Sequence, residues 1–156
     1  MPNFEGMKKS QPIQFHFLYP PFYLPNRTQL KGFIFNLIEK EGRQIEHINY
    51  IFCSDDYLLN INKTHLQHDT LTDIITFDYS AHKKDKIVSD IYISIDRVKE
   101  NAPLFHTTFQ KELLRVLFHG ALHLCGFKDK TKEDQQLMRN KEDYWLNKYF
   151  VSRETL

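Results

Sequence analysis

Two histidines four residues apart, His119 and His123, carry the clearest chemical signal in the chain. On a helix, residues at i and i+4 lie on one face, about 6 Å apart along the axis. Two imidazoles in that arrangement can share a metal ion, or each can be a core side chain that is hydrogen-bonded to the backbone. The pair by itself leaves both roles open.

The residues that follow the pair favour a metal site. Gly126 permits the positive φ that reverses a chain at a helix end, so the segment through Asp129 can return toward the imidazoles. Two nitrogen ligands and one carboxylate oxygen leave a fourth position for water, which is typical of catalytic zinc. The spacing H-x3-H-x2-G-x2-D predicts one metal ion per chain, Zn²⁺ or another divalent ion, held by His119, His123 and Asp129.

Gly120 occupies the position at which HExxH zinc peptidases carry their catalytic glutamate. Glycine cannot accept a proton from water, so peptide hydrolysis of that type is not expected. A glycine inside a helix costs about 1 kcal/mol relative to alanine, which indicates that a chain segment or a substrate passes close by. Three acidic residues are candidates for the general base instead: Glu112, Asp73 and Asp90.

The helix that carries the histidines is predicted over residues 110–125 and is apolar on nearly its whole circumference, so it should be buried. Its single polar stripe consists of Glu112, Arg115, His119 and His123. Arg115 lies one turn before His119 and is predicted to stabilise charge on a substrate, unless it forms an i,i+3 pair with Glu112. Partners for this stripe are expected, because an unpaired buried polar group costs about 1–3 kcal/mol.

The remaining elements must position this helix. Segments rich in Ile, Val, Tyr and Phe predict strands over residues 13–19, 45–53, 73–79 and 87–95. Cap and breaker residues predict five helices. The first covers residues 28–42, the second begins at Asp55, and the third runs from after Ile95 up to Pro103. The fourth follows a capping box of Thr107 and Gln110, and the fifth begins at Thr131. Strands and helices do not alternate regularly. We therefore predict an α+β fold, a small mixed sheet of about four strands covered by helices, with the metal site on a buried helix.

Composition limits the class of protein. A chain of 156 residues predicts a single domain over 1–156, and 41% hydrophobic with 26% charged residues is typical of a soluble globular protein. No stretch approaches the roughly 20 apolar residues of a membrane span, and the N-terminus lacks the apolar segment of a signal peptide. A cytoplasmic protein without membrane contact is expected. The net charge of +1 neither indicates nor excludes a nucleic-acid partner.

Three segments resemble the YbeY family of bacterial endoribonucleases. Residues 119–127, HGALHLCGF, resemble its HGxLHLxGYDH signature; residues 72–77, TDIITF, resemble its T-[DN]-V-L-S-F strand; and residues 89–94, SDIYIS, resemble its GDI-x-IS strand. The resemblance covers roughly residues 30–150. It implies a zinc-dependent enzyme that cleaves single-stranded RNA in 16S rRNA maturation and ribosome quality control, with the small ribosomal subunit or its proteins as partners.

Two positions depart from the family pattern. Asp129 stands where the family usually has its third histidine ligand, and aspartate is an acceptable zinc ligand. Leu66 stands where the family has an arginine that contacts phosphate. Four residues are candidates to replace that arginine: Lys63, His65, His68 and Arg115.

Two other functions remain open at this point. The first is a non-catalytic, metal-stabilised ribosome assembly factor, and the second is a metallopeptidase, which the missing glutamate disfavours. For RNA cleavage, water could attack phosphorus, or a base could activate the neighbouring 2′-hydroxyl. The sequence does not distinguish these chemistries.

Overall fold

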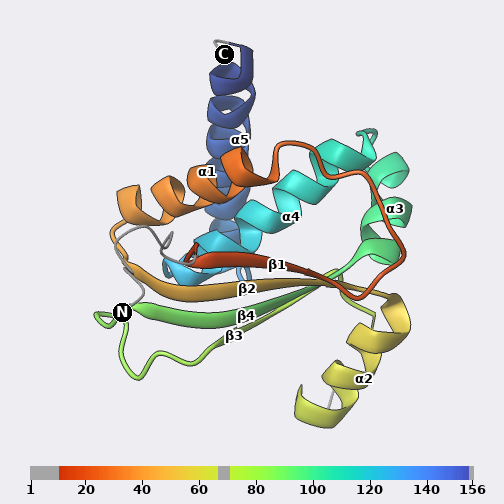
Figure 1. Ribbon diagram of the computed structural model, residues 1–156, viewed down its shortest axis with the longest axis horizontal. Coiled ribbons are helices and arrows are strands. Elements are labelled where there is room, and N and C mark those ends of the chain that lie inside the picture. Colours follow the sequence, from red (N-terminus) through yellow and green to blue (C-terminus); the bar gives the residue numbers. More distant parts are fainter. Residues whose placement is uncertain (1–10, 67–70, 155–156) are drawn as a thin grey trace, which may run out of the picture.

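The computed structural model describes residues 11–66 and 71–154. Its nine elements, shown in Figure 1, are β1 (Ile13–Phe17), α1 (Arg27–Lys40), β2 (Ile45–Cys53), α2 (Asp55–Leu66), β3 (Ile74–Asp78), β4 (Ile87–Ser94), α3 (Ile95–Leu104), α4 (Phe109–Leu124) and α5 (Lys132–Glu154). The predicted strands and helices are all present. The first strand ends at Phe17, two residues before its predicted end.

The four strands form one mixed sheet in the order β1-β2-β4-β3. β1 and β4 each pair in parallel with β2, whereas β3 pairs antiparallel with β4 and leaves its other edge free. Helices α1, α4 and α5 lie on one side of this sheet and α2 on the other (Figure 1). The predicted α+β fold, with about four strands covered by helices, is confirmed.

Helix α4 is the centre of the hydrophobic core, as its apolar circumference predicts. Leu113, Leu117 and Phe118 are fully buried between the sheet and the neighbouring helices. The buried Tyr50 hydroxyl of β2 donates to the Leu117 carbonyl at 2.9 Å and ties the helix to the sheet. The polar stripe of α4 faces away from this core, toward the free edge of β3 and the start of α5.

Gly120 lets α4 approach the sheet closely. A β-carbon at this position would lie 2.9 Å from Cδ1 of Ile74 and 3.2 Å from Cγ2 of Ile91. A contact as short as the first does not occur between packed carbon atoms, so a side chain here would force the Ile74 and Ile91 side chains to shift. The glycine is explained by helix–sheet packing rather than by a substrate passing over it.

Two predicted helix caps are wrong by one residue. Thr108, not Thr107, caps α4, because its hydroxyl accepts from the Lys111 amide. The Thr107 amide instead donates to Ala102 at the end of α3, so the predicted capping box with Gln110 does not form.

At α2 the cap is Ser54, whose hydroxyl accepts from the Tyr57 amide, rather than Asp55. The Asp55 carboxylate is drawn away from the helix end, because it accepts from the Ser94 hydroxyl and from Arg97. Thr131 caps α5 as predicted, by accepting from the Asp134 amide.

Neither cysteine forms a disulfide: Cys53 is buried and Cys125 is half-buried, and both are free thiols. Over residues 11–66 and 71–154, none of the helices combines the length and the apolar character needed to cross a bilayer.

Candidate metal centre

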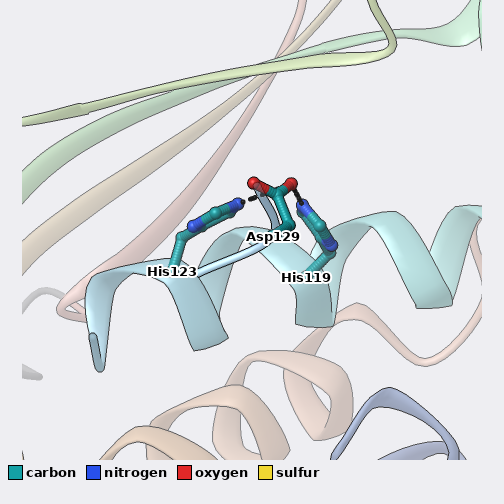
Figure 2. A group of neighbouring side chains, drawn as sticks. All are labelled: His119, His123 and Asp129. Atoms are coloured by element: carbon teal, nitrogen blue, oxygen red, sulfur yellow. Dashed lines mark hydrogen bonds and ion pairs between the residues drawn. The ribbon is translucent and has the colours of Figure 1, made fainter. Parts of the chain in front are cut away.

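His119, His123 and Asp129 converge at the C-terminal half of α4 (Figure 2). One carboxylate oxygen of Asp129 lies 3.3 Å from Nε2 of His119 and 3.2 Å from Nε2 of His123. Donor atoms of the three side chains all lie within 4.8 Å of one another. The convergence expected from the spacing is therefore present in the fold.

The turn after α4 brings Asp129 to the histidines. Gly126 has φ +99°, its amide donates to the His123 carbonyl at 3.0 Å, and the Phe127 amide donates to Leu122 at 3.1 Å. This hydrogen-bond pair is the Schellman motif, which ends a helix and reverses the chain. Glycine is needed here because a residue with a β-carbon is strained at this φ.

The three side chains are accessible from a groove. They are 20% (His119), 29% (His123) and 42% (Asp129) exposed, so solvent and a substrate can reach the space between them. The groove has a volume of about 1040 Å³ and lies between the free edge of β3, the polar stripe of α4 and the first half of α5. A substrate much larger than a single water molecule can therefore reach the histidines.

Glu142 of α5 orients the first histidine. Its carboxylate accepts from Nδ1 of His119 at 2.7 Å and is almost completely buried. With the Nδ1 proton held there, the lone pair of His119 Nε2 points toward Asp129 and the groove. A carboxylate behind an imidazole is the usual companion of a histidine that binds a metal.

Glu142 was not predicted from the sequence, although a signal was present. Its position continues the buried face of α5 that also carries Met138, Trp145 and Tyr149. An acidic residue within such an apolar stripe needs a buried partner. The sequence does not say which partner, because His119 lies 23 residues away.

The donor set fits a divalent metal. Two neutral imidazole nitrogens and one carboxylate oxygen suit Zn²⁺ and also other first-row divalent ions. The groove side of the cluster is open, which leaves room for a further ligand. His119, His123 and Asp129 are thus the described residues that could hold a metal ion.

Charges around His119 change its proton affinity. Burial lowers the pKa of His119, but the hydrogen bond and negative charge of Glu142, together with Asp129 and Asp73, outweigh burial and raise the pKa above its ordinary value of 6.5. The same surroundings favour a metal cation in place of the proton, because three carboxylates face one imidazole.

Arg115 lines the groove but forms ion pairs with α5. Nη1 lies 2.9 Å from Glu142 and Nη2 lies 2.8 Å from Asp143. Burial lowers the pKa of Arg115, while these two hydrogen bonds raise it more. The i,i+3 pair with Glu112 that the sequence suggested is replaced by these contacts, and the catalytic role of Arg115 stays a prediction.

Two of the three candidate bases reach the groove. Glu112 is 4% exposed, and among the described residues its Oε2 atom has no hydrogen-bond partner. Burial is also the largest cause of the raised pKa of both Glu112 and Asp73; the charge of His119 opposes the shift at Asp73. A carboxyl group with a raised pKa can exchange protons closer to neutral pH.

Asp90, the third candidate base, does not line the groove. Its carboxylate accepts from Asn49 at 3.0 Å and from the Tyr79 hydroxyl at 3.2 Å. Alternation along β4 directs Asp90 away from buried Ile91, to the sheet face opposite α4.

The candidates on α2 for a phosphate contact also lie away from the groove. Lys63 and His65 are not among the residues that line it, and α2 packs against the opposite face of the sheet (Figure 1). His68 lies outside the described residues. Of the three candidates that the structure describes, only Arg115 borders the metal centre.

The sequence of this chain is similar to that of one known protein family. Residues 27–150 match the sequence model of the family described as Endoribonuclease YbeY. Endoribonuclease YbeY of Flavobacterium psychrophilum is 49% identical over 132 residues, which is 85% of this chain and 93% of that protein. Endoribonuclease YbeY of Cytophaga hutchinsonii is 51% identical over 126 residues, 81% of this chain and 87% of that protein.

A solved structure extends the similarity to three dimensions. The solution structure of TM1509 from Thermotoga maritima superposes with a TM-score of 0.62 at 26% sequence identity, and the match covers 92% of both chains. The family match spans most of the chain, and the sequence relatives are aligned over most of their own length. The chain belongs to the YbeY family of endoribonucleases.

Proposed function

We propose that this chain is a metal-dependent endoribonuclease that cleaves single-stranded RNA and acts as one domain over residues 1–156. The observation that carries the proposal is the convergence of His119, His123 and Asp129 on one open point of a long groove. When bound there, a divalent ion supplies a Lewis acid that lowers the pKa of water and stabilises charge on phosphate oxygens. We propose Zn²⁺, one ion per chain, as this metal, because two imidazoles and one carboxylate are typical ligands of catalytic zinc.

The chain's own groups have separate roles in this proposal. Glu142 holds the His119 ring in one orientation and one tautomer. Asp73 and Glu112 border the groove with raised pKa values, and we assign the proton transfers to one of them. Arg115 holds Glu142 in place through an ion pair, and its predicted stabilisation of a phosphate would require it to share its two carboxylate partners.

The cellular role rests on the family. The curated relatives are named Endoribonuclease YbeY, so RNA is the substrate class that we assign to this chain. We further propose a cytoplasmic role in 16S rRNA maturation and ribosome quality control, with the small ribosomal subunit or its proteins as partners.

A peptidase of the HExxH type is disfavoured by packing as well as by sequence. The position of the catalytic glutamate is Gly120, and a side chain there would collide with Ile74 and Ile91. A glutamate introduced at this position would therefore have to displace both isoleucine side chains.

The test is cleavage of an end-labelled single-stranded RNA by the metal-loaded protein, beside a His123→Ala variant and a His47→Ala control. His47 lies in β2, hydrogen-bonds Asn49 and is not among the residues that line the groove. We expect cleavage by the wild type and by His47→Ala, and loss of at least about 100-fold in His123→Ala, because a ligand is removed.

Three results would contradict the proposal. Equal cleavage by the wild type and His123→Ala would mean that the activity does not use this centre. Equal cleavage of duplex and single-stranded RNA would exclude the strand preference. Stoichiometric metal binding without cleavage of either RNA would favour the assembly-factor function instead.

A further inference from the structure

Among the described residues, the α5 wall of the groove carries two cations without partners. Lys132, Gln135, Gln136 and Arg139 follow each other at helical spacing and all line the groove. The side chains of Lys132 and Arg139 are exposed, and within residues 11–66 and 71–154 neither has a hydrogen bond or an ion pair. Arg115 on the neighbouring helix differs, since two carboxylates already neutralise it.

Both cations are placed to act on a ligand at the metal centre. Arg139 lies one turn before Glu142, which contacts His119, and its positive charge is close enough to oppose the raised pKa of Glu112. Lys132 lies two turns further from Glu142, about 10 Å along the helix from Arg139. That separation is wider than one phosphate group, so the two cations would contact different phosphates of a chain.

The opposite wall, along β3, carries acidic rather than basic side chains. Asp73, just before β3, and Asp78, at its end, border the groove, and Asp78 is ion-paired with Arg43 at 3.2 Å. The Tyr79 amide donates to the Val88 carbonyl, and the Ser94 amide donates to the Asp73 carbonyl. The backbone groups of Asp73 and Tyr79, at the two ends of β3, therefore point toward β4.

By the alternation of an antiparallel pair, the backbone groups of Ile74, Thr76 and Asp78 point toward the free edge. The β3 wall therefore offers carboxylates and uncharged peptide groups. The residues of β3 that line the groove include no cation, so a phosphate has no partner of opposite charge on this side, whereas bases and riboses can form hydrogen bonds there.

We infer that Lys132 and Arg139 form a phosphate-binding site that holds the RNA backbone along α5, with the bases turned toward the free edge of β3. The inference rests on the proposed RNA substrate and adds the direction in which the strand's phosphates face. Each cation neutralises one phosphate, so each contributes to the salt dependence of binding.

The experiment measures binding rather than cleavage. A fluorescent single-stranded RNA with 2′-O-methyl groups is titrated with the full-length, metal-loaded protein at several KCl concentrations, and a gel verifies that the strand stays intact. Lys132→Gln and Arg139→Gln are each expected to weaken binding about threefold to tenfold and to reduce the slope of log K against log [KCl] by about 0.7. Arg139→Lys should retain the wild-type slope.

The matched control is Lys111→Gln, which removes the same charge from an exposed lysine in the first turn of α4, outside the groove. Unchanged slopes in Lys132→Gln and Arg139→Gln, with wild-type RNA binding and cleavage, would overturn the phosphate site alone. A wild type that neither binds nor cleaves single-stranded RNA would overturn the proposed function together with it. Equal slope losses in Lys132→Gln, Arg139→Gln and Lys111→Gln would mean that total charge, not this site, governs binding, and would also overturn the inference.

Discussion

At the scale of single residues, the metal centre depends on a carboxylate that is not one of its candidate ligands. Glu142 connects His119 to Arg115 through its two oxygens, at 2.7 Å and 2.9 Å. A ring held in this way keeps its Nε2 lone pair directed at the groove before any metal arrives. The His119 ring is then ordered when the protein folds, so metal binding does not have to order it.

Glu142→Gln should lower metal affinity about 10- to 100-fold, because the amide cannot hold the His119 proton as a charged carboxylate does. Competition with a chromogenic chelator measures the change. Asp143→Asn is the control, since Asp143 forms an ion pair with Arg115 rather than with His119 and is largely exposed. Unchanged affinity in Glu142→Gln, or an equal loss in Asp143→Asn, would contradict the orienting role.

Glu112 should make stability depend on pH. Its folded pKa is raised above the ordinary 4.5, chiefly by burial, with Asp73 and Glu142 adding to the shift and Arg115 and Arg139 opposing it. The folded state therefore binds this proton more tightly than the unfolded state, so the contribution of Glu112 to stability is greatest below pH 4.5 and is lost as the pH rises through the folded pKa.

Glu112→Gln removes this titration. Relative to the wild type, the metal-free variant should gain free energy of unfolding as the pH rises from about 4.5, with the difference becoming constant above the folded pKa. Urea unfolding of both proteins from about pH 4 to about pH 8 measures it. A difference that does not vary with pH would show that the folded and unfolded pKa values are equal.

At the scale of elements, the contact between α4 and the sheet is set by one glycine. The absence of a β-carbon at Gly120 allows Ile74 and Ile91 to pack against the helix backbone. This contact fixes the distance of the histidines from β3, and thereby the width of the groove at the metal centre.

Gly120→Ala should destabilise the protein by about 1 kcal/mol net, because overpacking of roughly 1–3 kcal/mol exceeds the helix-propensity gain of about 1 kcal/mol. Gly32→Ala in α1 is the matched control. A β-carbon added at Gly32 would have no neighbouring atom within 4 Å, so this substitution should stabilise by up to about 1 kcal/mol. Urea unfolding compares the two.

Ile74→Val, which removes the nearest methyl group, should relieve part of the cost when it is combined with Gly120→Ala. Strictly additive effects of the two substitutions, or equal stabilisation by both glycine replacements, would contradict the packing explanation.

At the scale of the whole molecule, the core and the candidate metal centre are spatially separate. The large cluster of buried side chains joins α1, α4 and α5 to the inner face of the sheet, and a second small cluster lies beneath α2. The candidate ligands lie outside both clusters, at the rim of the groove. The fold therefore does not need the metal to close its core, in contrast to small zinc-stabilised domains.

Removal of the metal by a chelator should leave the far-UV circular dichroism unchanged while RNA cleavage is lost. The melting temperature should fall by roughly 5–10 °C from its value at a free metal concentration of about 100 Kd, through loss of binding free energy. Readdition of Zn²⁺ should restore both properties. Unfolding on chelation would instead identify the metal as structural.

The features that sequence determined are those coded by nearby residues. Helical spacing places His119 and His123 on one face, and the glycine that ends α4 allows Asp129 to return to them. Alternation and β-branched residues mark all four strands. These patterns are readable because a helix turn, a cap or a strand face depends on residues within a few positions of each other.

Contacts between distant elements were decided by tertiary structure alone. The partners of His119 and Arg115 come from α5, and the face to which Asp90 points depends on the register of β4 in the sheet. The groove and its two unpaired cations exist only once α5 lies opposite the free edge of β3. Such contacts follow from the packing of whole elements, and the local sequence pattern does not specify that packing.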